Sequence, residues 1–181
     1  MKEQTQTITK VEAAHRQINE AIRLWFEERD DVAVLTLAAS GHQIIHDLNK
    51  AAGGEELLFD SPIIKKQFHR DWQHSLKNPW NFFKHADKPA ERDPNAQLEF
   101  DTTLVIDFIL FSTKGLRQLG IKHSPVELLF LFWLGLHRSD WLISKEKFRA
   151  EFDLDEQSEE TFRSLSRPEF FRTFYTPDSI T

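Results

Sequence analysis

The chain has 181 residues, no cysteine, 16 phenylalanines and five tryptophans, and its formal net charge is −6. A chain of this length fits one domain built around one core. The absence of cysteine excludes disulfides, thiolate metal sites and cysteine nucleophiles. The acidic net charge argues against a protein that is basic over its whole surface.

The first two predicted helices follow from an apolar repeat. Apolar residues recur at three- and four-residue steps from Ile8 to Phe26, which is typical of an amphipathic helix. Asp30-Asp31 offers a cap for a second helix, whose apolar face runs from Val34 to Leu48 and ends at Gly53-Gly54. We expect these two helices to pack antiparallel.

Two prolines predict the next helix starts. Ser61-Pro62 is followed by apolar residues at every fourth position from Ile64 to Leu76, which indicates a third helix. Asn78-Pro79 repeats the start signal and predicts a fresh, short helix over 80–86, set at an angle to the third. Residues 87–99 contain two prolines and no apolar period, so we expect a mobile surface loop there.

Two apolar helices are predicted in the second half of the chain. Asp101 can cap a helix that runs from Leu104 to Leu119, contains Asp107 and closes at Gly120. The sequence Ser124-Pro125-Val126-Glu127 is a capping box with proline at the first helical position. It starts the apolar run Leu128 to Leu136, which is far shorter than the roughly 20 residues that cross a bilayer. We expect this helix at the centre of the bundle, and no membrane association.

Taken together, these elements predict an all-α, up-and-down helical bundle. The bundle covers residues 1–140, and residues 141–181 form short helices packed on the same domain. The N-terminus lacks the apolar stretch of a signal peptide, so we expect a cytoplasmic protein.

Residues 65–88 form a basic stretch in an otherwise acidic chain. They hold six Lys or Arg against two acids, a local charge of +4, together with three histidines and several aromatic residues. Cations mixed with flat rings suit phosphate groups or single-stranded nucleic acid. The alternative is an ordinary solvated basic face of an amphipathic helix.

Within this stretch, the run Asn81-Phe82-Phe83-Lys84-His85 carries the most pointed chemistry. Three- and four-residue spacing places Asn81, Lys84 and His85 on one helical face. Lys84 could hold an anion, His85 could transfer a proton near neutral pH, and Asn81 could orient the ligand or the imidazole. Arg70 and His74 are further candidates for anion binding. The alternative is that these polar side chains are simply solvated.

His42 and His46 form a second candidate site. Their four-residue spacing on the predicted second helix could supply two nitrogens to one divalent metal, with His85 or Asp107 as a third ligand. Hydrogen-bonded histidines at the core boundary are the alternative, and no other cofactor is predicted. A third hypothesis is a non-enzymatic interaction module that uses the acidic segment 151–160 or a face of the bundle.

The second-helix sequence VLTLAASGHQIIHDLNKAAGG and the later N-x-x-K-H run are similar to those of small helical bacterial proteins. More distantly, the chain resembles the HEPN-like bundles, named for nucleotide binding in higher eukaryotes and prokaryotes. The resemblance covers residues 8 to 140. It implies a helical bundle, often a homodimer, that binds RNA or a nucleotide, and in many members a ribonuclease or toxin of a defence or toxin–antitoxin system.

The HEPN-like signature is an arginine followed by a histidine after four to six residues. Arg117 to His123 fits this spacing, but such a match is expected by chance in this composition. Arg70 to His74 is one residue too short. Lys84 therefore stands where the resemblance would place an arginine, a departure that favours anion binding over cleavage.

Overall fold

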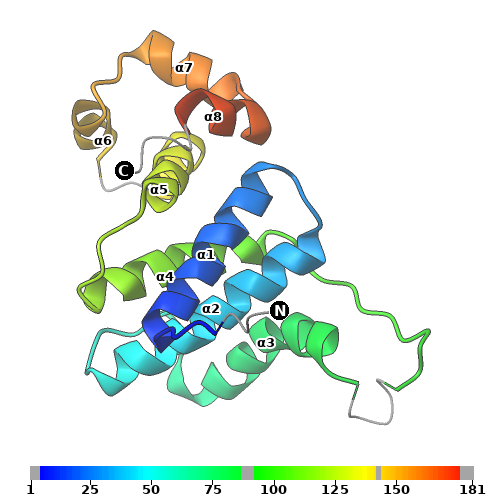
Figure 1. Cartoon of the computed structure of the whole chain (residues 1–181). Helices are drawn as coiled ribbons and strands as arrows, with labels where there is room; N and C mark the ends of the chain where they lie inside the picture. Colours follow the sequence, from blue (N-terminus) through cyan, green and yellow to red (C-terminus); the bar gives the residue numbers. More distant parts are fainter. Residues whose placement is uncertain (1–4, 87–91, 142–143, 176–181) are drawn as a thin grey trace.

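The computed structural model describes residues 5–86, 92–141 and 144–175, and these residues contain helices and no strand. The prediction of an all-α fold is confirmed (Figure 1). The α-helices are α1 (Lys10–Phe26), α2 (Asp31–Ala51), α3 (His69–Lys84), α4 (Leu104–Gln118), α5 (Pro125–His137), α6 (Lys145–Glu151), α7 (Glu156–Ser164) and α8 (Arg167–Phe174). Short 3₁₀-helices cover Lys66–Phe68 and Ser139–Trp141.

Helices α1 and α2 form the predicted antiparallel pair. The Thr9 side chain caps α1 in a capping box with Glu12, and the Asp30 side chain accepts from the backbone N–H of Ala33 to start α2. The two helices approach closely at Gly41, where an added Cβ would lie 3.1 Å from the Ala14 carbonyl oxygen. The small residues at this crossing allow the close contact.

Helix α2 is the central helix of the bundle, because α1, α3 and α4 all pack against it (Figure 1). Its contact with α4 is tight at Gly115, where a Cβ would meet the Ile45 side chain at 2.5 Å. Gly53 and Gly120 follow the ends of α2 and α4 with φ angles of +75° and +78°, so the two predicted glycine stops are confirmed.

The C-terminal helices cover the far side of α5. Phe26 of α1 stacks on Phe170 and Phe171 of α8, with ring centroids 6.0 and 5.3 Å apart. Helix α5 starts at the predicted capping box, packs against α1 and α7, and has eight of its 13 residues buried. It therefore lies between the bundle and the C-terminal layer, whereas we expected it at the bundle centre.

Helix α3 differs from its prediction at both ends. The chain from Ser61 turns twice before α3 begins at His69, and Ile63 and Phe68 point into solvent. The helix then continues through Pro79 to Lys84 without the predicted break at Asn78. A proline inside a helix costs roughly 3 kcal/mol. Here Leu76, Pro79 and Trp80 are buried on the same face of α3, so packing against α2 outweighs this cost.

Part of the predicted loop at 87–99 lies outside the described residues, namely 87–91. Residues 92–99 form no helix or strand, and the segment returns to the body at Phe100, whose ring packs edge-on against Phe83 at 5.0 Å. No helix in the described ranges is long and apolar enough to cross a membrane.

Candidate nucleic-acid interface

Five polar side chains share one side of α3. At about 100° per residue, Arg70, His74, Lys77, Asn81 and Lys84 fall within a sector of about 80°. Arg70, His74 and Lys84 are exposed, and Lys77 and Asn81 are partly buried. We call these five residues the α3 polar stripe. It extends over about 21 Å at 1.5 Å per residue.

Lys84 is positioned by a tryptophan. Its Nζ lies 3.6 Å from the centroid of the Trp80 ring, and the indole N–H of Trp80 donates to the Ser40 hydroxyl of α2 at 3.0 Å. Partial burial lowers the pKa of Lys84. The ammonium group therefore rests on a ring that is itself fixed to the bundle, which keeps a positive charge near one end of the stripe.

Lys77 lies at the middle of the stripe. Its Nζ is 4.3 Å from the Phe59 ring centroid. Burial lowers the pKa of Lys77, and the Asp47 carboxylate opposes that change. Lys77 thus packs against the segment between α2 and α3 as well as contributing to the surface charge.

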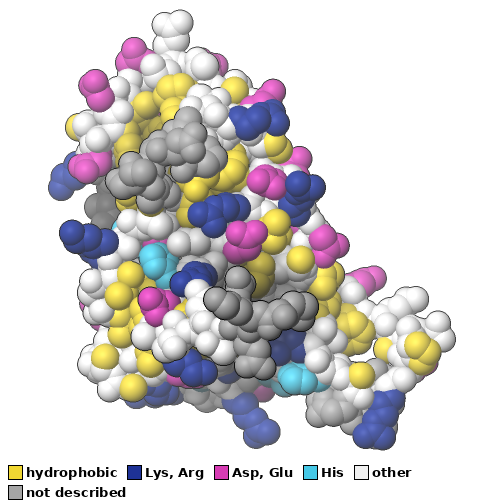
Figure 2. Space-filling model, in the orientation of Figure 1, with side chains coloured by type: hydrophobic (Ala, Val, Ile, Leu, Met, Phe, Trp, Pro, Cys, Tyr) yellow, Lys and Arg dark blue, Asp and Glu magenta, His cyan; other side chains and the backbone are white. Residues whose placement is uncertain are grey.

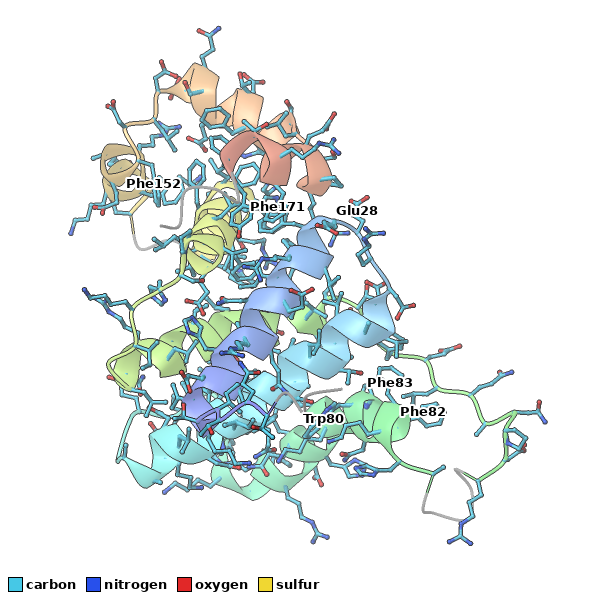
Figure 3. All side chains as sticks on the ribbon, viewed as in Figure 1. Glu28, Trp80, Phe82, Phe83, Phe152 and Phe171 are labelled. Atoms are coloured by element: carbon cyan, nitrogen blue, oxygen red, sulfur yellow. The ribbon has the colours of Figure 1, made fainter. Side chains whose placement is uncertain are left out.

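His85 does not lie on the helical face that the spacing predicted. Helix α3 ends at Lys84, and His85 has extended backbone angles of φ −129° and ψ 143°. Its backbone N–H donates to the Asn81 carbonyl, and its side chain is exposed. Asn81 and Lys84 share the stripe, while His85 follows its end. Phe82 and Phe83 belong to the last turn of α3 and lie near the returning segment (Figure 3).

His42 is fully buried in the interior. The Ser112 hydroxyl donates to the Phe108 carbonyl at 2.6 Å, so its oxygen accepts from His42 Nδ1 at 3.1 Å. This contact assigns the proton to Nδ1 and leaves Nε2 as a bare acceptor, without a hydrogen-bond partner among the described residues. Burial, with a smaller contribution from His46, lowers the pKa of His42 to about 3. His42 is neutral at physiological pH.

His46 contacts two carboxylates instead of sharing a ligand with His42. Its Nδ1 is 3.2 Å from Asp47 Oδ1 and its Nε2 is 3.3 Å from Asp60 Oδ2, while its ring centroid is 6.3 Å from that of His42. Within the described ranges, no three His, Asp or Glu side chains are arranged to hold a metal ion. Neither His85 nor the partly buried Asp107 completes such a group, so the metal hypothesis has no third ligand here.

The sequence did not predict the buried carboxylate that lies between two histidines. Glu127 is fully buried; its Oε1 lies 3.2 Å from His15 Nε2, and its Oε2 lies 3.5 Å from His123 Nδ1. Neither contact has the alignment of a hydrogen bond. The Glu127 carboxylate raises the pKa of His15, and partial burial opposes this change. The capping box indicated Glu127 as a cap, but nothing in the local pattern indicated that α1 would place His15 against it.

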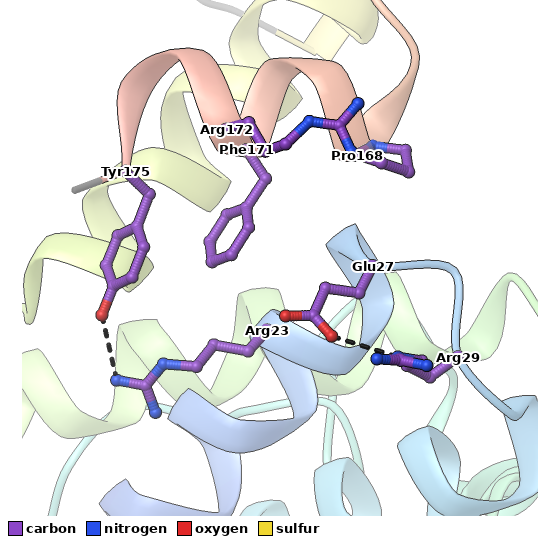
Figure 4. A pocket seen from close by; sticks show the side chains of 7 residues that line it. All are labelled: Arg23, Glu27, Arg29, Pro168, Phe171, Arg172 and Tyr175. Carbon is purple, nitrogen blue, oxygen red and sulfur yellow. Dashed lines mark hydrogen bonds and ion pairs between the residues drawn. The ribbon is translucent and has the colours of Figure 1, made fainter. Parts of the chain in front are cut away.

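A cavity of about 650 Å³ between α1 and α8 carries three arginines (Figure 4). Arg23 donates to the Tyr175 hydroxyl at 3.3 Å and pairs with Glu20, while Arg29 pairs with Glu27, which also lines the cavity. Arg172 lies on the α8 side. The guanidinium groups do not converge in Figure 4, and nearby carboxylates offset the charges of Arg23 and Arg29, so this cavity is a weaker anion site than the α3 polar stripe.

The fold and the stripe define an all-α protein with a cationic helix face. Comparison of the chain with protein-family models, with curated proteins and with solved structures gives no match.

Proposed function

We propose that this protein binds RNA through the α3 polar stripe, contacting the phosphates of a single strand. The supporting observation is the placement of three cationic side chains, Arg70, Lys77 and Lys84, on one side of one helix in a chain of net charge −6. A positive strip within an acidic surface attracts a phosphate backbone locally while the rest of the protein repels it.

The neighbouring groups suit the same ligand. Asn81 and His74 lie between the cations and can donate hydrogen bonds to phosphate or sugar oxygens. Phe82 is partly exposed at the end of α3, where a base could stack on it. The proposal extends to a HEPN-like role, in which His85 transfers a proton and Lys84 contacts the phosphate if RNA is cleaved.

Charge reversal tests the binding proposal. We expect Arg70→Glu combined with Lys84→Glu to lower the affinity for a short fluorescein-labelled single-stranded RNA by about tenfold or more, because two phosphate contacts become repulsive. Lys145→Glu combined with Lys147→Glu on α6 is the matched control, since it changes the net charge equally at exposed sites. Fluorescence anisotropy measures both. Equal losses in the two double variants would show that only net charge matters.

The same assay mixtures report cleavage. On a denaturing gel, any cleavage by the wild-type protein should be lost in His85→Ala and in Lys84→Ala, while Lys145→Ala, at an exposed site on α6, should retain it. Cleavage that persists in both α3-end variants would remove His85 from the proposed role.

A further inference from the structure

A second surface feature lies at the other end of the molecule, on the C-terminal helices. It is an apolar groove of about 620 Å³, which we call the α5–α8 groove. Its apolar lining includes Leu128, Leu129, Phe132, Leu154, Phe162 and Phe174. Figure 2 shows hydrophobic side chains gathered over the C-terminal helices on the face that it draws.

The groove exposes large apolar side chains to solvent. Leu128 is 51% exposed, Phe152 41% and Phe174 38%, and all three line the groove. The rings form a packed cluster, because the Phe132 and Phe152 centroids are 4.7 Å apart and those of Phe162 and Phe174 are 4.9 Å apart. A contiguous apolar surface that is held rigidly in place marks an interaction site more often than scattered exposed residues do.

The rim of this groove is acidic. Asp153 is its one charged lining residue among those described, and it belongs to the segment 151–160, which holds six acids and no base. Glu159 of this segment is buried and pairs with Arg149 and Arg163, and Glu156 also contacts Arg149. Asp155 also lies at the groove, because its carboxylate accepts from the backbone N–H of Ser158, which lines the groove, and both Asp153 and Asp155 are exposed. The charge of the rim therefore favours a positively charged partner.

Asp153 occupies a backbone position that favours glycine. Its φ angle is +50°, and it follows Phe152, the C-cap residue of α6. The helix end is closed by a hydrogen bond from the Leu154 N–H to the Arg149 carbonyl. Helices α2 and α4 end in the same way, but there the residue with positive φ is Gly53 or Gly120. An acid thus stands at the groove where a glycine would be less strained.

We infer that the α5–α8 groove docks a basic amphipathic helix of a protein partner. Apolar side chains along one face of such a helix fill the groove, and lysines or arginines flanking that face meet Asp153 and the neighbouring acids. The site is separate from the α3 polar stripe, so this inference stands independently of RNA binding.

Designed peptides test the inference with the full-length protein. An amphipathic helical peptide of leucine and lysine, fluorescently labelled, should bind with at least tenfold higher affinity than the leucine–glutamate peptide of equal length and apolar face. Leu128→Lys and Phe174→Lys should each abolish that preference, because each replaces apolar surface with a positive charge in the groove. Ile63→Lys is the matched control, because Ile63 is 85% exposed and does not line the groove. Circular dichroism verifies that each variant is folded.

Asp153 gives a sharper test, because two effects should separate. We expect Asp153→Gly to raise Tm by about 2–4 °C, because glycine adopts the left-handed conformation without strain. The same substitution should lower the affinity for the leucine–lysine peptide severalfold. Glu28 is the matched control, since it follows α1 with a φ angle of +55° in the same helix ending and lies near α8 instead of the groove (Figure 3). Glu28→Gly should leave the affinity for the leucine–lysine peptide unchanged.

Three results would overturn the inference. They are equal affinity of the two peptides, a preference for the leucine–lysine peptide that survives in both groove variants, and a self-associated wild-type protein that Leu128→Lys converts to monomers in sedimentation velocity. The last result would mean that a second copy of the chain occupies the groove.

Discussion

His42 shows how one side chain can be recognised in the sequence and still have a different role in the structure. Its spacing from His46 suggested a metal ligand, but its ring is enclosed by Phe59 and Phe108 and held by the Ser112 hydroxyl. An imidazole in such surroundings stays neutral because burial disfavours its charged form. The structure therefore supports His42 as part of the core, with a bare Nε2 as its unusual feature.

This burial has a consequence for stability at acid pH. The folded pKa of His42 is about 3, below its ordinary value of 6.5, so the unfolded chain takes up a proton that the folded chain refuses. The contribution of His42 is present above pH 6.5 and is lost as the pH falls towards 3. We expect a loss of about 2 kcal/mol in the free energy of unfolding between pH 7 and 5.

Urea unfolding at several pH values measures this loss. In His42→Gln the pH dependence over that interval should be shallower by the same amount, because no imidazole titrates there. If wild type and variant show parallel pH profiles, or if an NMR titration of the His42 ring gives a midpoint near 6.5, the ring is not buried as described.

Local residue patterns predicted two of the capping groups correctly, whereas the N-cap residue of α4 is Thr103 instead of Asp101, and α3 begins at His69, well after Ser61. Asp30 and the Ser124–Glu127 capping box both cap helices, because a cap depends on neighbours within one turn. The same patterns could not predict that Glu127 lies against His15, or that Lys84 rests on Trp80 while His85 leaves the helix. Those outcomes depend on packing between helices and on where α3 ends.

At the scale of elements, α3 is where the prediction was least accurate. A proline after asparagine usually starts a helix, and local chemistry alone favoured a break at Pro79. Burial of Leu76 and Trp80 on the face that meets α2 holds the helix continuous instead. That continuity creates the α3 polar stripe, since a break would have separated Arg70 and His74 from Asn81 and Lys84.

The contact between α2 and α4 offers a test of the bundle packing. We expect Gly115→Ala to lower the free energy of unfolding by about 1–3 kcal/mol, because the added Cβ would lie 2.5 Å from Ile45 Cγ2 and 2.8 Å from Leu57 Cδ1. Alanine at an exposed helical site has the opposite tendency relative to glycine.

Lys114→Ala, at the adjacent exposed position, is the control and should change stability by less than about 0.5 kcal/mol. Urea unfolding measures both variants. A Gly115→Ala protein as stable as the wild type would mean that α2 and α4 do not approach as closely as the structure describes.

At the scale of the whole molecule, the helices that carry the two charged surfaces, α3 and the C-terminal α6 to α8, lie at opposite ends (Figure 1). The α3 polar stripe is cationic, and the rim of the α5–α8 groove is acidic, so the net charge of −6 conceals two local fields of opposite sign. This separation suits a protein that holds a nucleic acid at one end and a basic protein segment at the other. The sequence predicted both charge blocks, because a run of like charges is visible without a fold. It could not predict that an apolar groove lies beside the acidic segment.

The salt dependence of RNA binding tests the central claim most directly. Three cations on the α3 polar stripe should give a slope of about −2 in a plot of the logarithm of the association constant against that of the salt concentration, at about 0.7 per phosphate contact of a single strand. Arg70→Glu combined with Lys84→Glu should make the slope shallower, with a magnitude of about 0.7 or below. The α6 control pair should leave the slope unchanged. Binding whose slope is the same in all three proteins, or no binding by the wild type at low salt, would contradict the claim.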